Sequence, residues 1–108
     1  MNRDNRVAFV PKTVHKSASY TMLPDDDILF TDSSGGAITI TLPRLADVIG
    51  KLITIQNLAG TNNVVLAVPG NEATNYATIE GLDIDAVGDR LVLRSNGRAW
   101  EVIENAIA

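Results

Sequence analysis

The chain has 108 residues, the length of a single domain, and a domain of this size buries roughly two-thirds of the surface that its unfolded form exposes. Hydrophobic residues make up 45% of the sequence but aromatic residues only 5%, so the core must consist mainly of Val, Ile, Leu and Ala, a composition that favours β-structure. The absence of cysteine excludes disulfides, thiolate nucleophiles and thiolate metal ligands.

Charge is divided unevenly along the chain, whose net charge is −4. Residues 1–20 carry four cations and one anion, a net +3, whereas residues 21–108 carry five cations and twelve anions, a net −7. An acidic body repels phosphate groups, and four dispersed cations are too few for a nucleic-acid footprint, so no nucleic-acid partner is expected. No apolar run has the length of a signal peptide or a membrane span, and the chain is therefore expected to be made in the cytoplasm without a membrane partner.

Residues 1–17 show no sustained periodicity and contain a short apolar patch, residues 7–10, which Pro11 stops. They are predicted to form an N-terminal arm, and residues 18–108 a single β domain. Within that domain, short β-rich runs alternate with clusters of Gly, Pro, Asn and Asp, which is typical of a short-stranded antiparallel sandwich, barrel or prism-like module. One helical turn is predicted at residues 44–49, before Gly50.

Two hairpins are predicted in the first two-thirds of the chain. Residues 38–42 alternate strictly between Ile or Leu and Thr, the pattern of a half-buried strand, and residues 27–31 are its expected partner. Residues 51–56 and 63–68 form the second predicted pair, joined by a loop with Gly60.

A third hairpin is predicted near the end of the chain, where residues 90–95 and 98–103 flank Asn96 and Gly97. Asn-Gly suits a two-residue type I′ turn, because both residues accept a positive φ, and the register then places Ser95 opposite Arg98.

The same register pairs Leu93 with Trp100 on one face of the hairpin, and this face is predicted to belong to the core. The other face carries Val92 and Ile103 among charged residues. It has two interpretations, a solvated face or a contact with a neighbouring subunit.

Residues with catalytic chemistry are present but form no complete motif. His15, the single histidine, falls in the predicted arm, where nothing is expected to hold its ring beside a nucleophile. Glycoside cleavage needs two carboxylates, one of them with a raised pKa, and residues 25–27, Asp83 and Asp85 are the candidates. These acids lie in turn-like polar contexts that favour full ionisation, so the chain is predicted not to be an enzyme.

Residues 83–94 resemble the start of an EF-hand loop, with Asp83, Asp85 and Gly88 at its first, third and sixth positions. The pattern then fails, because Val87 stands where an oxygen ligand is needed and Arg94 where the bidentate Glu belongs. We therefore expect a polar turn before the last hairpin and assign no metal ligand. No phosphate-binding motif occurs, and no cofactor is expected.

The strand and turn signals follow one another in a distinctive order over about residues 18–103. The residues that carry this order are 38–43, 50–51, 53–55, 57, 62–66, 69–70, 79–81, 88, 95–97 and 100–103. In this order they resemble a β-rich module of bacteriophage virion proteins, found in tail fibres and spikes and in some head-decoration proteins. The resemblance implies a homotrimer in a phage particle. Fibre proteins carry the module at the end of a long chain, whereas this chain runs only from Met1 to Ala108 and is expected to attach by itself.

These considerations lead to one preferred function and two alternatives. The preferred function is a homotrimeric capsid-decoration (cement) protein of the virion, which binds the major capsid protein or another virion protein of the head shell. A tail-fibre or spike component that binds host-surface glycans is the first alternative, and an enzyme acting on polysaccharide is the second.

The N-terminal arm is the expected attachment device of such a protein. Ordering 17 residues costs on the order of 17–34 kcal/mol in backbone entropy, more than a few buried apolar side chains return, so only a stretch of about residues 6–11 is expected to add as an edge strand to a partner sheet. A terminus without a partner is the alternative interpretation. The residues expected to bind the partner are Arg3, Arg6, Val7, Phe9, Val10 and Lys12.

Overall fold

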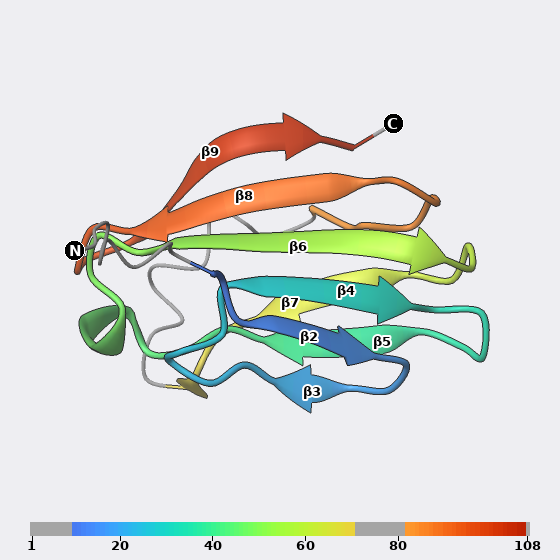
Figure 1. Cartoon of the computed structure of the whole chain (residues 1–108), viewed down its shortest axis with the longest axis horizontal. Helices are drawn as coiled ribbons and strands as arrows, with labels where there is room; N and C mark the ends of the chain where they lie inside the picture. Colours follow the sequence, from blue (N-terminus) through green and yellow to red (C-terminus); the bar gives the residue numbers. More distant parts are fainter. Residues whose placement is uncertain (1–9, 71–81, 108) are drawn as a thin grey trace, which may run out of the picture.

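The computed structural model describes residues 10–70 and 82–107 of the chain. These residues form two β-sheets, a five-stranded sheet in the order β2-β4-β6-β8-β9 and a three-stranded sheet in the order β3-β5-β7 (Figure 1). The elements are β2 Thr13–Lys16, β3 Tyr20–Thr21, β4 Ile28–Asp32, β5 Ile38–Thr41, the 3-10 turn η1 Leu45–Asp47, β6 Leu52–Ala59, β7 Val64–Ala67, β8 Arg90–Ser95 and β9 Trp100–Ala106. The prediction of an all-β fold is confirmed.

The first six of these strands alternate between the two sheets. β2, β4 and β6 belong to the five-stranded sheet, and each is followed by a strand of the three-stranded sheet. Neighbouring strands are parallel, because Thr13 pairs with Ile28 and Ile28 with Thr54 in one sheet, while Ile38 pairs with Val64 in the other. The three strand pairs therefore stack like successive turns of a coil (Figure 1).

The first two predicted hairpins are wrong, and with them the antiparallel pairing expected before residue 70. β4 and β5 lie in different sheets, as do β6 and β7. Alternation specifies which side chains face the core, but it does not specify which strand supplies the hydrogen bonds. Leu29 of β4 and Ile40 of β5 both enter the core from opposite sheets. Each loop therefore forms an arch between the sheets, and among the described residues neither sheet closes into a barrel.

One hydrophobic core lies between the sheets. In the segment that contains β5, Ile38, Ile40 and Leu42 are buried and Thr39 is exposed, which confirms the predicted alternation. The helical turn expected at residues 44–49 is confirmed by η1, which buries Leu45. The five-stranded sheet contributes the fully buried side chains of Leu29, Ile53, Ile55, Leu91, Leu93 and Trp100.

A buried polar pair closes one end of this core. Thr31 of β4 and Asn57 of β6 are register partners, and the Thr31 hydroxyl donates to Asn57 Oδ1 at 2.9 Å. Asn57 Nδ2 donates to the carbonyl of Gly60 at 2.9 Å, and its backbone N–H donates to the carbonyl of Asp89 at 3.0 Å. These bonds satisfy the buried amide and fasten two loops to the end of the sheet.

The third predicted hairpin is confirmed as an antiparallel pair, but its register is not. Ser95 pairs with Trp100, so the loop has four residues rather than two. Asn96 does not take a positive φ, and its Oδ1 instead accepts the N–H groups of Arg98 and Ala99, each at 2.9 Å. Near the turn the shift is two residues, an even number, so Trp100 keeps its predicted inward face and is fully buried as expected. Beyond an irregularity between Val92 and Leu93 the shift is three residues.

The predicted boundary between arm and domain is also wrong, because β2 is an edge strand of the five-stranded sheet and pairs with β4. Within β2, Val14 packs against the core and His15 lies outside it, with its ring centroid 5.1 Å from that of Phe30. The strand could not be predicted from the sequence, because it has only four residues and a single inward apolar side chain, too few to show alternation. Residues 1–9 lie outside the described part of the chain.

Candidate interaction surface

The five-stranded sheet has an outer face, which we define as the side turned away from β3, β5 and β7. Along β4 and β6, every second residue is buried in the core, as Leu29 and Ile55 are, and the residues between them face outward. The strand β8 follows the same rule. The outer face is formed by Ile28, Phe30, Leu52, Thr54, Gln56, Leu58 and Val92.

Two exposed leucines mark the ends of β6 on this face. Leu52 is 51% exposed and Leu58 is 46% exposed. Beside Leu52 is a hollow of about 550 Å³ that is lined by Pro11, Asp27, Ile28, Gly50, Lys51, Leu52 and Thr54. Beside Leu58 is a hollow of about 300 Å³ that is lined by His15, Lys16, Ser17, Phe30, Thr31, Asp32, Leu58 and Ala59. Grouped apolar exposure of this kind marks a binding surface more often than isolated exposed residues do.

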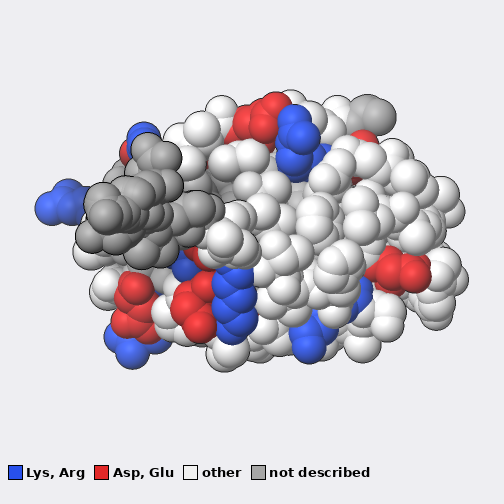
Figure 2. Space-filling model, viewed as in Figure 1, with Lys and Arg blue, Asp and Glu red and all other residues white. Residues whose placement is uncertain are grey.

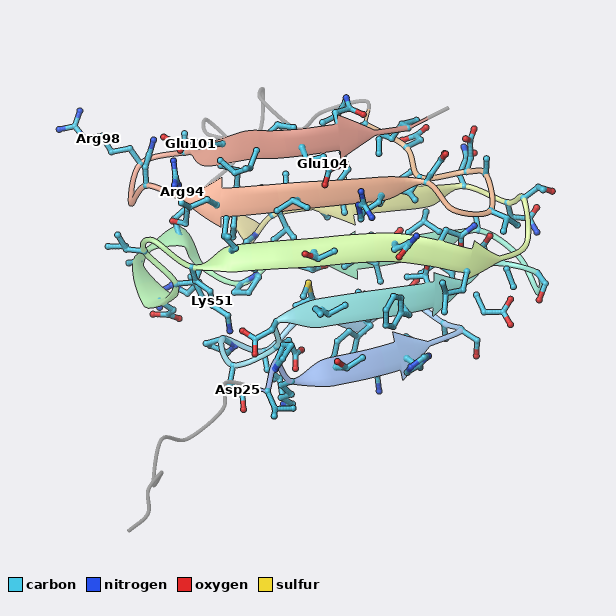
Figure 3. All side chains as sticks on the ribbon, turned by 45° about the horizontal axis from the view of Figure 1, so that its top comes forward. Asp25, Lys51, Arg94, Arg98, Glu101 and Glu104 are labelled. Atoms are coloured by element: carbon cyan, nitrogen blue, oxygen red, sulfur yellow. The ribbon has the colours of Figure 1, made fainter. Side chains whose placement is uncertain are left out.

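Charged side chains surround the outer face. Figure 2 views the molecule from this side and shows an uncharged centre, with Lys, Arg, Asp and Glu toward the borders. On the border formed by β8 and β9, Arg90 Nη2 lies 2.8 Å from Glu104 Oε2, and Arg94 Nη2 lies 2.8 Å from Glu101 Oε1 (Figure 3). The guanidinium of Arg94 holds the pKa of Glu101 below its ordinary value, so this carboxylate is ionised at neutral pH.

The opposite border is formed by the turn that precedes β4. Lys51 Nζ, at the start of β6, lies 3.2 Å from Asp27 Oδ1 and donates to the carbonyl of Pro24 at 2.6 Å. Lys51 therefore joins the start of β6 to this turn, and its charge is balanced within the chain.

Asp26, in the same turn, is fully buried and accepts several hydrogen bonds. Its Oδ2 accepts the hydroxyl of Tyr20 at 2.6 Å and the N–H of Leu23 at 2.8 Å, and its Oδ1 lies 3.0 Å from Lys12 Nζ. Burial alone would raise the pKa of Asp26, but these donors outweigh it and hold the pKa below its ordinary value. The carboxylate is thus a fixed anion and not a proton donor of the kind that glycoside cleavage needs.

The residues predicted to bind a partner fall into two groups. Arg3, Arg6, Val7 and Phe9 lie outside the described residues. Val10 is 80% exposed and precedes Pro11, which lines the hollow beside Leu52.

Lys12, the remaining predicted partner residue, is held within the fold. Its ammonium lies 3.0 Å from Asp25 Oδ1 and 3.0 Å from Asp26 Oδ1, and these carboxylates raise its pKa. Its backbone N–H donates to Asp27 Oδ2 at 2.7 Å. Lys12 therefore stabilises the acidic turn, and we no longer expect it to bind a partner.

Asp83 and Asp85 do not converge on a site. Ile84 between them is fully buried and donates its N–H to the carbonyl of Val64 at 2.9 Å, while Asp85 is exposed. The following turn is closed by Asp89, whose Oδ2 accepts the N–H of Ala86 at 3.1 Å, which confirms the predicted polar turn. In the described ranges, no group of three His, Cys, Asp or Glu side chains is arranged to hold a metal ion.

Reasoning from the sequence reached only the part of the outer face on β8, where a neighbouring subunit was one interpretation of the face with Val92, and missed the part on β4 and β6. The sequence of β6 contains a signal for this face. Ile53, Ile55 and Asn57 point into the core, and Leu52 points to the other side of the sheet, where a half-buried strand is expected to carry polar residues. An apolar residue on the side of a strand that is expected to be polar indicates a second contact surface.

Comparisons with protein families, with curated proteins and with solved structures find no match. Within the described residues, no helix has both the length and the apolar character needed to cross a membrane.

Proposed function

We propose that this chain is a structural protein of a bacteriophage virion, a homotrimeric capsid-decoration protein that binds the head shell and carries out no reaction. The observation that supports this proposal best is the outer face of the five-stranded sheet. It carries the exposed side chains of Leu52 and Leu58 near the two ends of β6, and the hydrogen bonds of β6 to β4 and β8 hold them in place. Such a face binds another protein surface by apolar contact.

The lowered pKa values of two acidic groups also favour a structural role. A catalytic carboxylate pair needs one member with a raised pKa. Asp26, the buried member of the acidic turn, has a lowered pKa, and so has Asp32 at the end of β4, where the hydroxyl and N–H of Ser34 bind its carboxylate. Both groups stabilise turns.

Attachment to the shell is assigned to residues 1–11, a shorter segment than the arm first predicted. Lys12 is bound to the acidic turn, and β2 begins at Thr13, so neither can leave the fold without breaking the sheet edge. The apolar residues 7–10 precede Pro11 directly. In the proposed attachment, this patch lies against the shell protein while the β domain stays folded.

Removal of residues 1–9 tests this attachment. The truncated protein is expected to fold and to keep the oligomeric state of the full chain, but to lose co-sedimentation with capsid shells that lack decoration. Phe9→Asp in the full chain should weaken shell binding in the same way. Val87→Asp, in the turn before β8, is the matched control and should bind normally. Unchanged shell binding by the truncated protein would show that attachment lies elsewhere.

A tail-fibre or spike component that binds host-surface glycans is the second candidate, and one observation favours it. The hollow beside Leu58 combines the ring of Phe30 with His15, Lys16 and Asp32, so an apolar surface adjoins hydrogen-bonding groups. Binding sites for small polar ligands commonly have this composition. Copy number and position in the particle separate the two candidates, because a decoration protein coats the head and a fibre protein occurs in few copies at the tail.

A further inference from the structure

We infer that the outer face of the five-stranded sheet is the surface through which copies of this chain bind one another. The number of copies in this inference rests on the proposed function, but the choice of surface does not. The choice follows from charge, from the position of the apolar side chains in the sheet, and from the two hollows.

Charge balance points to an identical copy as the occupant. The ion pairs that border the face contain four cations and five anions, a net charge of −1; they are Lys12 with Asp25 and Asp26, Lys51 with Asp27, Arg90 with Glu104 and Arg94 with Glu101. The whole chain has a net charge of −4. A surface that meets copies of itself must avoid a net charge, because like charges would face each other. The border of the outer face comes closer to this condition than the molecule as a whole, and each of these charges has a partner within the chain.

Most of the apolar side chains of this face lie on two adjacent strands. Ile28 and Phe30 lie on β4, and Leu52 and Leu58 lie on the neighbouring strand β6. Leu52 and Leu58 are six residues apart, about 20 Å along an extended strand. The result is an apolar stripe along β4 and β6, with the ion pairs of β8 and β9 along one side and the Lys51–Asp27 pair at the end where β4 and β6 begin. Figure 3 labels Lys51 at this end and Arg94, Glu101 and Glu104 on β8 and β9.

A stripe of this shape fits a small number of copies whose strands run side by side. In the proposed trimer, the three outer faces turn toward a common threefold axis and the stripes meet there. The borders then lie at the rim, where their ion pairs stay in contact with water. This is the usual arrangement of a protein interface, with an apolar centre and a polar periphery. The hollows beside Leu52 and Leu58 provide room for apolar side chains of the neighbouring copies.

Sedimentation velocity over a range of protein concentrations tests this inference with a double variant, Leu52→Glu with Leu58→Glu. Both side chains face solvent in the isolated chain, so the variant is expected to fold, as far-UV circular dichroism can verify. Unpaired carboxylates inside an interface oppose association strongly, and the dissociation constant should rise by about 100-fold or more. The full chain is expected to sediment as a trimer and the variant as a monomer.

The matched control is Leu23→Glu with Val87→Glu. These residues are 49% and 62% exposed, line neither hollow, and receive the same change in charge. This variant should assemble like the full chain. A monomeric full chain, an unaffected outer-face variant or an equal loss in the control would each overturn the inference. A chain that assembles through the outer face but is absent from phage particles would instead refute the proposed function and leave the inference intact.

Discussion

Asp26 shows how a residue with the appearance of a surface acid becomes part of the fold. It is the middle member of three consecutive aspartates, yet it is fully buried, while Asp25 remains exposed. Its carboxylate accepts the Tyr20 hydroxyl and the Leu23 N–H and pairs with Lys12. A buried anion is tolerated only when donors of this kind replace its water.

Asp26→Asn should therefore destabilise the protein in a pH-dependent way. The pKa of Asp26 is lowered in the folded state, so its contribution to stability is complete above the unfolded pKa of about 4 and is lost as pH falls through the lower folded value. At neutral pH the variant should lose about 1–3 kcal/mol in free energy of unfolding. Chemical denaturation from pH 7 down to about pH 2 should show the difference narrowing below about pH 4.

The control for this measurement is Asp25→Asn, because Asp25 is the exposed neighbour with a side chain 72% accessible to solvent. It should change the free energy of unfolding by less than about 1 kcal/mol. A constant difference between the Asp26 variant and the full chain over the whole pH range would mean that the buried carboxylate is not ionised.

Individual residues differed in how far their roles could be predicted from the sequence. Trp100 was assigned to the core from the alternation of its strand, a local property, and it is fully buried. Asp26 could not be recognised, because its partners Lys12 and Tyr20 reach it only through the fold. His15 was likewise expected in a loose arm, whereas it lies in an edge strand beside Phe30.

At the scale of elements, strands were predictable and most of their partners were not. Periodicity located β4, β5, β6 and β7 because each needs alternate residues in the core. The same periodicity allows a hairpin within one sheet or an arch between two, and short loops suit both. Only β8 and β9 were paired correctly. The parallel strands pair across one turn of the coil, β4 with β6 and β5 with β7, and no local signal in the sequence specifies these partners.

The close approach of adjacent turns of the coil leaves no room for a side chain at Gly60. This residue follows β6, has a φ of 84°, and approaches the turn after β4 so closely that an added Cβ would lie 2.2 Å from the Ser34 backbone nitrogen. Gly50 has almost the same φ, 82°, but open space around it. The two glycines thus separate the cost of a left-handed backbone from the cost of a steric clash.

Gly50→Ala should lower the free energy of unfolding by about 1–2 kcal/mol, because only the backbone conformation is penalised. Gly60→Ala carries the same penalty and also forces two backbone segments apart, which should add at least about 2 kcal/mol. Thermal or urea unfolding of both variants measures the difference. Equal losses would show that the two loops do not approach each other as described.

At the scale of the whole molecule, the parallel strands β2, β4 and β6 and the antiparallel pair β8–β9 form the five-stranded sheet, which has one face in the core and one face outside. The inner face was predictable, because burial in the chain's own core leaves a periodic pattern. The outer face was predictable only in part, because its apolar residues lie outside the core that the described residues form. Leu52 and Leu58 appear in the sequence only as exceptions to the alternation of β6.

The proposed function makes this chain part of a phage particle, so electron microscopy of purified particles tests it most directly. The account predicts that the chain covers the head shell in many copies, grouped in threes, with the outer faces of the five-stranded sheets turned toward each threefold axis. Its absence from the particle, or its presence only as a few copies at the tail, would contradict a capsid-decoration protein.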